Sequence, residues 1–277
     1  TGSNFPGDVI QLFDGTTAIG SAVTLTVANI AAGFVNIQTG VLSNATHAIT
    51  AKVTDTTGAQ SGTAIAVNVS IDTVAPAVAV TGVAVDTANL PVVTVNGTVG
   101  VSDAGQTVSV YDGATLVGTA AAGVDGSWSL AGVTLVEGAN NLTATVTDAA
   151  GNTGTSSTFA APTMVSTGTT TASAATITSM GYIVFGSGTL DVEAGANVTG
   201  QIIVGAGGVV FVETGASASN AVVSGGTLYD YGNASGTTLS VRAISVPRFA
   251  VMSTSAISSS PGPGCSVSVK RNVLCLA

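Results

Sequence analysis

Two blocks of sequence near the start of the chain recur about a hundred residues later, and this duplication strongly constrains the fold. The segment VIQLFDGTTAIG at 9–20 recurs as VSVYDGATLVG at 108–118, and AITAKVTDTTG at 48–58 recurs as LTATVTDAAG at 142–151. Both blocks alternate apolar and polar residues and end in Asp-Gly or Gly-containing turns, which is typical of strands and hairpins. A repeat of this length, made of strands with no helix, predicts tandem β-sandwich modules. Modules in a row usually span a distance or present a surface, so the duplication argues against an enzyme.

Charged residues make up only 7% of the 277-residue chain, and aromatic residues 4%, whereas soluble domains average about 25% charged residues. Thr, Ser and Asn side chains must therefore keep the surface hydrated, and β-branched Thr and Val also suit a pleated sheet. A β-protein of small, weakly charged residues is typical of secreted bacterial surface proteins. No run approaches the ~20 apolar residues that a membrane helix needs, so this stretch is not expected to span a membrane.

The charge is divided unevenly along the chain. All 14 acidic residues lie before residue 241, against one basic residue, Lys52, while the segment 241–277 carries four basic residues and no acid. An acidic body disfavours nucleic acid, whose phosphates need Lys and Arg, and is compatible with divalent cations. The chain begins without an initiator Met or a signal peptide, which we interpret as a mature or excised segment.

The second copy of the repeat is the complete one. Strands are expected near 77–84, 91–98, 107–111, 115–121, 127–131, 140–147 and 154–160. Seven short strands with frequent turn signals predict an immunoglobulin-like (Ig-like) sandwich. The single tryptophan, Trp128, alternates with Leu130 and is expected in the core; the alternative is a stacking platform for a ligand.

The first copy matches the second from about Gly2 onward, with Phe34 at the position of Trp128, but nothing in it corresponds to residues 76–99. Two strands are therefore expected to be missing from the first module. This predicts an incomplete sandwich with an unpaired strand edge and an exposed core.

The residues of both modules together resemble a known family. The motifs that carry the resemblance are DTVAP at 72–76, VYDG followed by VGT, DGSWSL at 125–130, and the stretch from EG to AGNT at 137–153. Together they are similar to the bacterial Ig-like repeats of large biofilm adhesins. The resemblance covers residues 1–160. It implies an extracellular stalk at the bacterial cell surface and a role in adhesion.

From about residue 163 the period of the sequence changes. Three units at 188–200, 209–220 and 227–237 each contain an internal glycine, and these glycines, Gly195, Gly215 and Gly232, recur at a nearly regular interval. Short strands joined by Gly turns at this spacing predict a right-handed β-solenoid whose rungs bury Val and Leu against one another. These units also resemble the strand-loop-strand repeats of autotransporter adhesin passengers, across residues 165–240.

The fold class expected is therefore all-β, with tandem Ig-like sandwiches followed by a short solenoid. The domain ranges are 1–73 for the incomplete Ig-like domain, 74–161 for the complete one, 163–240 for the solenoid and 241–277 for an irregular tail. Repeat register, charge and cysteine usage all change near residue 241. Either the tail is a frameshifted, non-native end, or it is a genuine short tail.

Little in the sequence suggests catalysis. The only histidine, His47, begins a strand and has Asn140 as its counterpart, so it is interpreted as a surface strand residue rather than a catalytic base. Cys265 and Cys275 have no histidine nearby, so a zinc site is not expected, and either a disulfide or two free thiols fits.

Acidic residues recur across the solenoid units. A solvated acidic ladder or a weak cation site is expected there rather than the paired carboxylates of a polysaccharide-degrading enzyme. These residues are Asp191, Glu193, Glu213 and Asp230.

The one cation site that the sequence suggests is at the junction of the Ig-like modules. In this topology Asp72, Asp103 and Asp148 come from a linker and two loops at one end of the second module, and Asp14 lies in a turn at the facing end of the first. Converging hard oxygen ligands suit Ca²⁺. The alternative is that these Asp residues only cap turns or precede the linker.

The main hypothesis is a non-enzymatic fragment of a bacterial cell-surface adhesin. Ig-like modules would form a stalk leading into a solenoid passenger segment, acting in cell adhesion or biofilm formation, with surface or host glycans or proteins as partners. The alternative is a glycan-binding module of a secreted protein. A solenoid polysaccharide-degrading enzyme comes third, because a usable histidine and paired catalytic groups are lacking.

Overall fold

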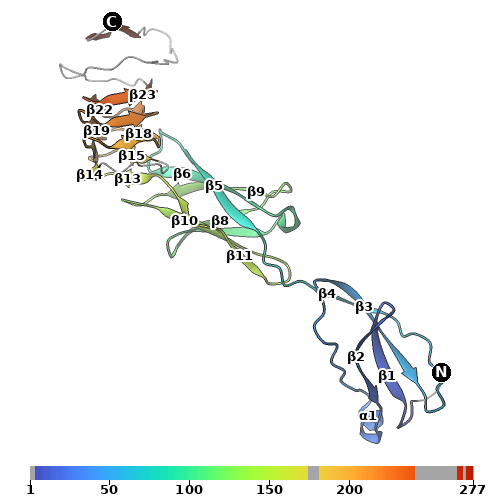
Figure 1. The fold of residues 1–277 in the computed structure, drawn as a ribbon. Helices are drawn as coiled ribbons and strands as arrows, with labels where there is room; N and C mark the ends of the chain where they lie inside the picture. The colour runs from blue at the N-terminus through green and yellow to red at the C-terminus, as the bar shows by residue number, and fades with distance from the viewer. Residues whose placement is uncertain (1–3, 174–180, 241–266, 271–272, 277) are drawn as a thin grey trace. The chain divides into compact units, whose positions relative to one another are not determined.

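The computed structural model describes residues 4–173, 181–240, 267–270 and 273–276. The chain divides into two units (Figure 1). The first unit comprises Thr1–Ala75 with the short loop Ala149–Asn152, and the second comprises Pro76–Asp148 with Thr153–Ala277. The architecture is all-β, as expected, with Ig-like sandwich modules built from antiparallel strands followed by a solenoid built from parallel ones.

The first unit contains one four-stranded antiparallel sheet in the order β2-β1-β3-β4. Its strands are β1 (Val9–Asp14), β2 (Thr17–Thr24), β3 (Ala45–Thr54) and β4 (Val67–Ile71). The Asp14-Gly15 turn joins β1 to β2, as the Asp-Gly signal predicted. Within the described residues of this unit no second sheet covers the first, which matches the expectation of an incomplete sandwich.

A short helix, α1 (Val27–Ala32), interrupts the first unit, whereas the sequence analysis expected no helix. Thr26 caps its first turn: the Thr26 hydroxyl accepts from the Asn29 backbone N–H, and the Asn29 side chain accepts from the Thr26 backbone N–H. Gly33 ends the helix in the left-handed conformation. Such reciprocal capping with a terminal glycine is a local helix signal, and none of the helical residues is buried.

The complete Ig-like module is a two-layer sandwich in the second unit. One sheet has the order β5-β6-β9, and the other β11-β10-β7-β8, with β12 also pairing with β10. The strands are β5 (Val78–Val85), β6 (Val92–Val99), β7 (Thr107–Asp112), β8 (Thr115–Ala121), β9 (Ser127–Thr134), β10 (Asn141–Thr147), β11 (Thr153–Thr155) and β12 (Phe159–Ala160). A single 3₁₀ turn, η1 (Val101–Asp103), follows β6. These bounds agree closely with the seven expected strands, except that the last one is divided into β11 and β12.

Trp128 lies in the core between the two sheets, with 3% of its surface exposed. It stands opposite Gly97 of β6 in the strand register. A Cβ atom at position 97 would lie 2.0 Å from Cζ2 of Trp128, so the glycine makes room for the indole ring. The expectation that Trp128 packs in the core is confirmed.

The solenoid follows as three stacks of short parallel strands (Figure 1). The first stack is β13 (Thr163–Val165), β15 (Tyr182–Val184), β18 (Ile202–Val204), β21 (Val222–Ser224) and β24 (Thr238–Ser240). The second is β14 (Thr169–Ala172), β16 (Thr189–Val192), β19 (Val209–Val212) and β22 (Thr227–Asp230), and the third is β17 (Asn197–Val198), β20 (Ser217–Ser219) and β23 (Asn233–Ser235).

Equivalent residues stack in register from rung to rung. Leu190 pairs with Val210, and Val210 with Leu228. Leu190 and Val210 are fully buried, because each faces the interior of its rung. The recurring glycines at 195, 215 and 232 lie in the turns that lead into β17, β20 and β23, so the sequence period corresponds to one rung.

The hydrophobic core of the complete Ig-like module extends into the first rungs of the solenoid, whereas the interior of the solenoid forms a second core that includes Leu190 and Val210. Met164, Ile183 and Ile203 of the solenoid pack with Val95 and Leu142 of the sandwich. Met164 also exchanges two backbone hydrogen bonds with Gly138, each 2.9 Å long. The sequence predicted two folding units joined near Pro162, and this division stays a prediction, although the core of the sandwich extends past that residue.

Near the C-terminus, β25 (Val267–Lys270) and β26 (Val273–Leu276) pair antiparallel. This is regular structure inside a segment that was expected to be irregular. The remainder of 241–277, Cys265 included, lies outside the described residues, and the frameshift interpretation stays untested.

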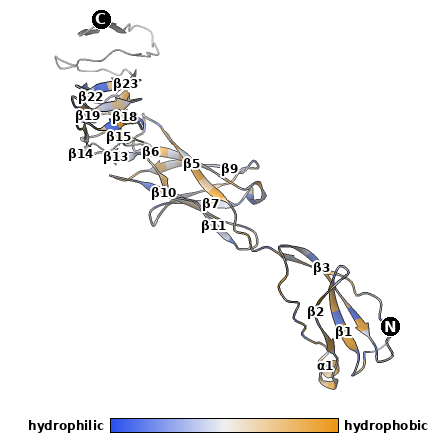
Figure 2. Ribbon diagram, in the orientation of Figure 1, coloured by the Kyte–Doolittle hydropathy of each residue, from blue (hydrophilic) through white to orange (hydrophobic). Residues whose placement is uncertain are grey.

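Figure 2 shows hydrophobic stretches in β1 and β5, one in each unit.

Candidate binding surface

The pairing of β1 with β3 in the first unit is equivalent, residue by residue, to the pairing of β7 with β10 in the covered sheet of the second. Asp14 stands opposite Ile49 where β1 pairs with β3, and Asp112 stands opposite Leu142 where β7 pairs with β10. Both Asp residues begin the same Asp-Gly turn into the next strand. This register makes β1, β2 and β3 the counterparts of β7, β8 and β10.

Five apolar side chains of the first unit are equivalent to core residues of the second, and we call them the open face. In the second unit each counterpart is at most 1% exposed, whereas all five in the first unit are only partly buried. The pairs are Ile10 with Val108, Leu12 with Val110, Ile49 with Leu142, Ala51 with Ala144, and Val53 with Val146. The open face is thus a core surface that is not covered within the described residues of its unit.

The difference lies in the covering sheet. In the second unit, β9 carries Trp128 and pairs with β6. In the first unit the equivalent stretch, residues 34–43, forms no strand, and Phe34 is 66% exposed. A strand needs backbone partners, and the counterpart of β6 is the part of the repeat that the first copy lacks.

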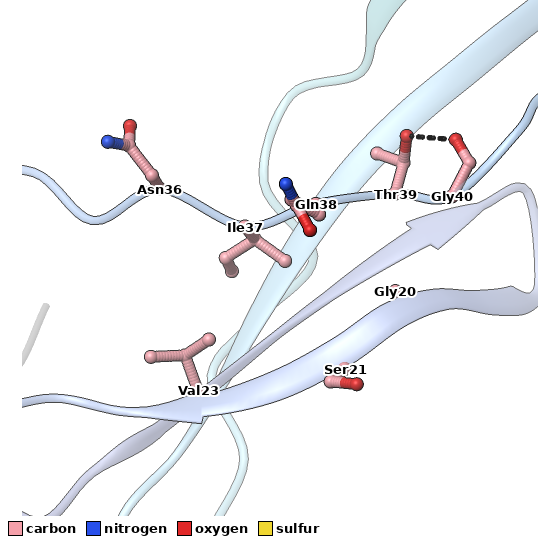
Figure 3. Close-up of a pocket in the computed structure, with 8 residues that line it drawn as sticks. All are labelled: Gly20, Ser21, Val23, Asn36, Ile37, Gln38, Thr39 and Gly40. Atoms are coloured by element: carbon pink, nitrogen blue, oxygen red, sulfur yellow. Dashed lines mark hydrogen bonds between the residues drawn. The ribbon is translucent and has the colours of Figure 1, made fainter.

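An open pocket of about 850 Å³ lies between β2 and this irregular stretch (Figure 3). The Ile37 side chain points toward Val23 of β2 across the pocket. The Gln38 carbonyl approaches Gly20 so closely that a Cβ atom there would lie 2.1 Å from it, and Gly20 has a φ of 65°. Only glycine suits both the close approach and that conformation.

The opposite face of the same sheet is better protected. The ammonium group of Lys52 lies over the ring of Phe13, 5.3 Å from its centroid, in a cation–π contact. Exposed apolar side chains of the first unit occur on α1 (Val27, Ile30), on β4 (Val67, Val69) and in the segment that follows α1 (Phe34, Val41).

His47 is buried, not a surface residue as the sequence analysis interpreted it. Its Nδ1 lies 2.6 Å from Oδ2 of Asp14, and its Nε2 lies 2.8 Å from the carbonyl oxygen of Ser43. The hydrogen bond to the Ser43 carbonyl, followed by that to Asp14, raises the pKa of His47 above its usual value near 6.5.

Asn140, the counterpart of His47, makes an equivalent hydrogen bond to the backbone. Its Nδ2 donates to the carbonyl oxygen of Val136 at 3.0 Å, four residues earlier, just as Nε2 of His47 bonds Ser43 four residues earlier. Both side chains therefore hold the loop that enters β3 or β10. The position requires a buried hydrogen-bonding side chain, and it is structural in both modules.

The four Asp residues expected to bind calcium are divided between the two units. In the first unit, Asp14 is paired with His47, and Oδ1 of Asp72 accepts from the backbone N–H of Val74 at 3.0 Å. In the second, Asp103 is buried in η1 and accepts from the Ser102 hydroxyl at 3.1 Å, and Asp148 follows β10. No group of three or more His, Cys, Asp or Glu side chains suited to a metal occurs within the described residues of the chain. The calcium site stays a prediction.

The expected acidic ladder of the solenoid is interrupted. Asp230 takes the register of the buried Val192 and Val212 and is itself buried. Its two carboxylate oxygens accept from the backbone N–H groups of Gly232 and Ala234, both at 3.1 Å. The carboxylate therefore braces the turn after β22 from inside, while Glu193 and Glu213 are exposed.

The outward-facing position directly before Asp230 in each rung carries aromatic residues in two of the rungs, and the sequence had not drawn attention to them. Asp191, Phe211 and Tyr229 occupy successive rungs. The rings of Phe211 and Tyr229 stack with centroids 4.9 Å apart and planes 9° apart, and Tyr231 beyond them is 56% exposed. The signal that could have found the pair is the rung period itself, because it places these two aromatic residues at equivalent positions of neighbouring units.

Comparison with known proteins supports the Ig-like assignment. A family model described as a bacterial Ig-like domain matches residues 94–163. The match runs from β6 into β13, so it includes most of the sandwich and the first residue of the solenoid. No curated protein matches the sequence.

Several solved structures are similar in part. Fibronectin(III)-like modules of CbhA from Clostridium thermocellum are 16% identical, with a TM-score of 0.29, covering 56% of this chain and 79% of that one. A domain of a biofilm associated protein is 20% identical, with a TM-score of 0.24, covering 55% of this chain and 24% of that one. A bacterial ice-binding adhesin is 24% identical, with a TM-score of 0.28, covering 67% of this chain and 62% of that one.

The described residues contain no helix with the length and apolar character needed to cross a membrane.

Proposed function

We propose that this chain is part of a bacterial cell-surface adhesin. The observation that carries the proposal is a bacterial Ig-like domain at 94–163 inside a chain that duplicates the module and continues it into a solenoid. Repeated sandwiches present length and surface rather than a catalytic cleft. The proposed role is a stalk that carries the solenoid away from the cell, in adhesion or biofilm formation.

The proposal is a non-enzymatic one. Both ring nitrogens of His47 are engaged, one by a carboxylate and one by a backbone carbonyl. An imidazole held in this way has no free nitrogen with which to accept a substrate proton. The chemistry of the only histidine in the chain is thus accounted for by the fold of the first unit.

The test uses the bacterium that encodes the chain. Antibodies raised against the purified chain should label intact cells, and deletion of the region encoding 76–240 should reduce attachment and biofilm mass without slowing growth. An in-frame replacement of that region by unrelated Ig-like modules of equal length is the control for stalk length alone. Absence of labelling on intact cells, with labelling after lysis, would sink the proposal.

A second candidate, glycan binding by the solenoid, is favoured by one specific observation. Phe211 and Tyr229 form a stacked aromatic pair on an outward-facing position, and Tyr231, two residues after Tyr229, is exposed. Aromatic side chains combine apolar contact area with a polar group at the tip, which suits the mixed surface of a sugar. Glycan-array signals that disappear in a Tyr229→Ala, Tyr231→Ala variant, and persist in Leu116→Ala, would support this role.

A further inference from the structure

The outward surface of the solenoid carries two neighbouring columns of residues in which carboxylates are followed by aromatic rings. The members of each column take equivalent positions in three successive rungs, through the strand register in the first column and equivalent backbone hydrogen bonds in the second. The columns are Asp191–Phe211–Tyr229 and Glu193–Glu213–Tyr231. We call these six residues the carboxylate–aromatic surface, and we propose that it binds a glycan that carries free amino groups. This inference rests on the glycan-binding role suggested above for the solenoid.

The carboxylates of this surface have no cationic partner. Residues 163–240 contain no Lys, Arg or His, and within the described residues no ion pair involves Asp191, Glu193 or Glu213. Oδ1 of Asp191 is also shielded from solvent, and it has no hydrogen-bond partner in the described part of the chain. A shielded carboxylate oxygen without a partner costs free energy. A ligand that brings a positive charge and N–H donors would supply the partner that is missing.

The aromatic rings lie directly beyond these carboxylates. Because the rings of Phe211 and Tyr229 stack 4.9 Å apart, the other face of Phe211 is directed toward the rung of Asp191. Neighbouring rungs are about 4.8 Å apart, so one bound sugar can reach both a carboxylate and a ring. An ammonium group is attracted to each of them. Tyr231, 56% exposed, adds an apolar ring with a polar tip in the second column.

Two other kinds of cation fit this surface less well. An extended peptide commonly binds a sheet by adding a strand to its edge, but the backbone groups of β16 and β19 are already paired with neighbouring rungs on both sides. A metal ion needs several converging oxygen ligands, and the described residues hold no group of three or more acidic, His or Cys side chains suited to one. A glycan with amino groups needs only side chains at regular intervals, which the rungs supply.

The experiment titrates the full chain with two linear hexasaccharides, one of β-1,4-linked glucosamine and one of the same sugar with every amino group acetylated. At mildly acidic pH the free amino groups are protonated, and calorimetry should show saturable binding of the glucosamine form and at least about tenfold weaker binding of the acetylated form. Asp191→Asn should remove most of this difference. Asp86→Asn, the same change in the loop between β5 and β6, should leave both affinities within about twofold.

The aromatic rings are tested by Tyr229→Ala, which should weaken the binding of both hexasaccharides because stacking does not depend on the amino group. Equal affinity of the unmodified chain for the two forms overturns the amino-group preference and leaves glycan binding intact. An effect of Asp86→Asn as large as that of Asp191→Asn overturns the proposal as well, since binding would then follow the total charge.

A hexapeptide of lysine that binds as tightly as the glucosamine form also overturns the proposal, because the cation alone would then decide. Failure of both hexasaccharides to bind overturns it too. A glycan array separates this last result from failure of the wider role: array signals for other sugars leave glycan binding in place, whereas a blank array removes both.

Discussion

Nδ1 of His47 lies 2.6 Å from Oδ2 of Asp14, while Nε2 of the same ring faces the carbonyl oxygen of Ser43. A carboxylate and a carbonyl are both acceptors, so both ring nitrogens must carry hydrogen. The two acceptors therefore favour the imidazolium form of His47, which agrees with its raised pKa.

This pairing predicts how the stability of the first unit depends on pH. Because the folded-state pKa of His47 is raised above the unfolded value near 6.5, its contribution is full below about pH 6.5 and is lost as the pH rises through the folded pKa. His47 is the only histidine, so its single ring resonance in an NMR titration should report that pKa directly. Asp14→Asn should lower it toward the usual value.

The matched control for the pH effect is His47→Asn, since Asn140 occupies this position in the second unit. Hydrogen exchange at β3, corrected for intrinsic rates, should lose its dependence on pH above neutrality in this variant. A wild-type pKa of His47 at or below the ordinary value would contradict the hydrogen-bond assignment.

Gly97→Ala should destabilise the second unit by about 1–3 kcal/mol, the range for overpacking a filled core. The new Cβ would lie 2.0 Å from the Trp128 ring and 2.2 Å from the carbonyl oxygen of Ala79. Gly82→Ala on the neighbouring β5 is the control, because a Cβ there meets nothing within 4 Å. Urea unfolding followed by Trp128 fluorescence measures both; equal midpoints for the two variants would refute the packing argument.

Because the sandwich core includes solenoid residues, a destabilising substitution in the solenoid should also lower the stability of the Ig-like module. Ile183 of the solenoid is fully buried in the core that also contains Trp128, so Ile183→Ala should lower the free energy of unfolding by about 2–5 kcal/mol. If the sandwich and solenoid unfold together, the transition reported by Trp128 should move to lower urea. Leu116→Ala, at a side chain 53% exposed, should change it by less than about 0.5 kcal/mol. If the Trp128 transition does not move in Ile183→Ala, the sandwich and the solenoid are separate folding units joined near Pro162.

Calcium is predicted to bind weakly through Asp72 and Asp148 and to raise the melting temperature, because ligand binding stabilises the folded state. The double substitution Asp72→Asn, Asp148→Asn should abolish that rise. Asp86→Asn, in the loop between β5 and β6, serves as the control. A melting temperature that does not change with excess calcium means that the site does not exist.

Much of this architecture follows from local sequence patterns. Alternating residues with Asp-Gly turns located the sandwich strands, and the absence of a second copy of 76–99 predicted the open sheet. Glycine spacing located the rungs of the solenoid. These features depend on residues close together in the chain, or on comparison of one repeat with the other.

The features that were missed depend on contacts that the pattern does not carry. His47 is buried because Asp14, 33 residues earlier, pairs with it, and a lone histidine gives no sign of such a partner. Asp230 faces inward because it takes the register position of the buried Val212 in its rung, and the recurrence of acidic residues in the sequence does not tell which face each one takes. Met164 joins the sandwich core through contacts with residues on distant strands, which an Ala-Ala-Pro linker signal conceals.

The pair of backbone hydrogen bonds between Met164 and Gly138 has a consequence for how such proteins diversify. A sandwich whose interior is closed by solenoid side chains cannot be exchanged for another sandwich by recombination at residue 161, because the transplanted module would lack part of its interior. The segment that can be moved intact runs from Pro76 through the rungs. Exchange at this boundary would remove Met164, Ile183 and Ile203 from the core of the sandwich.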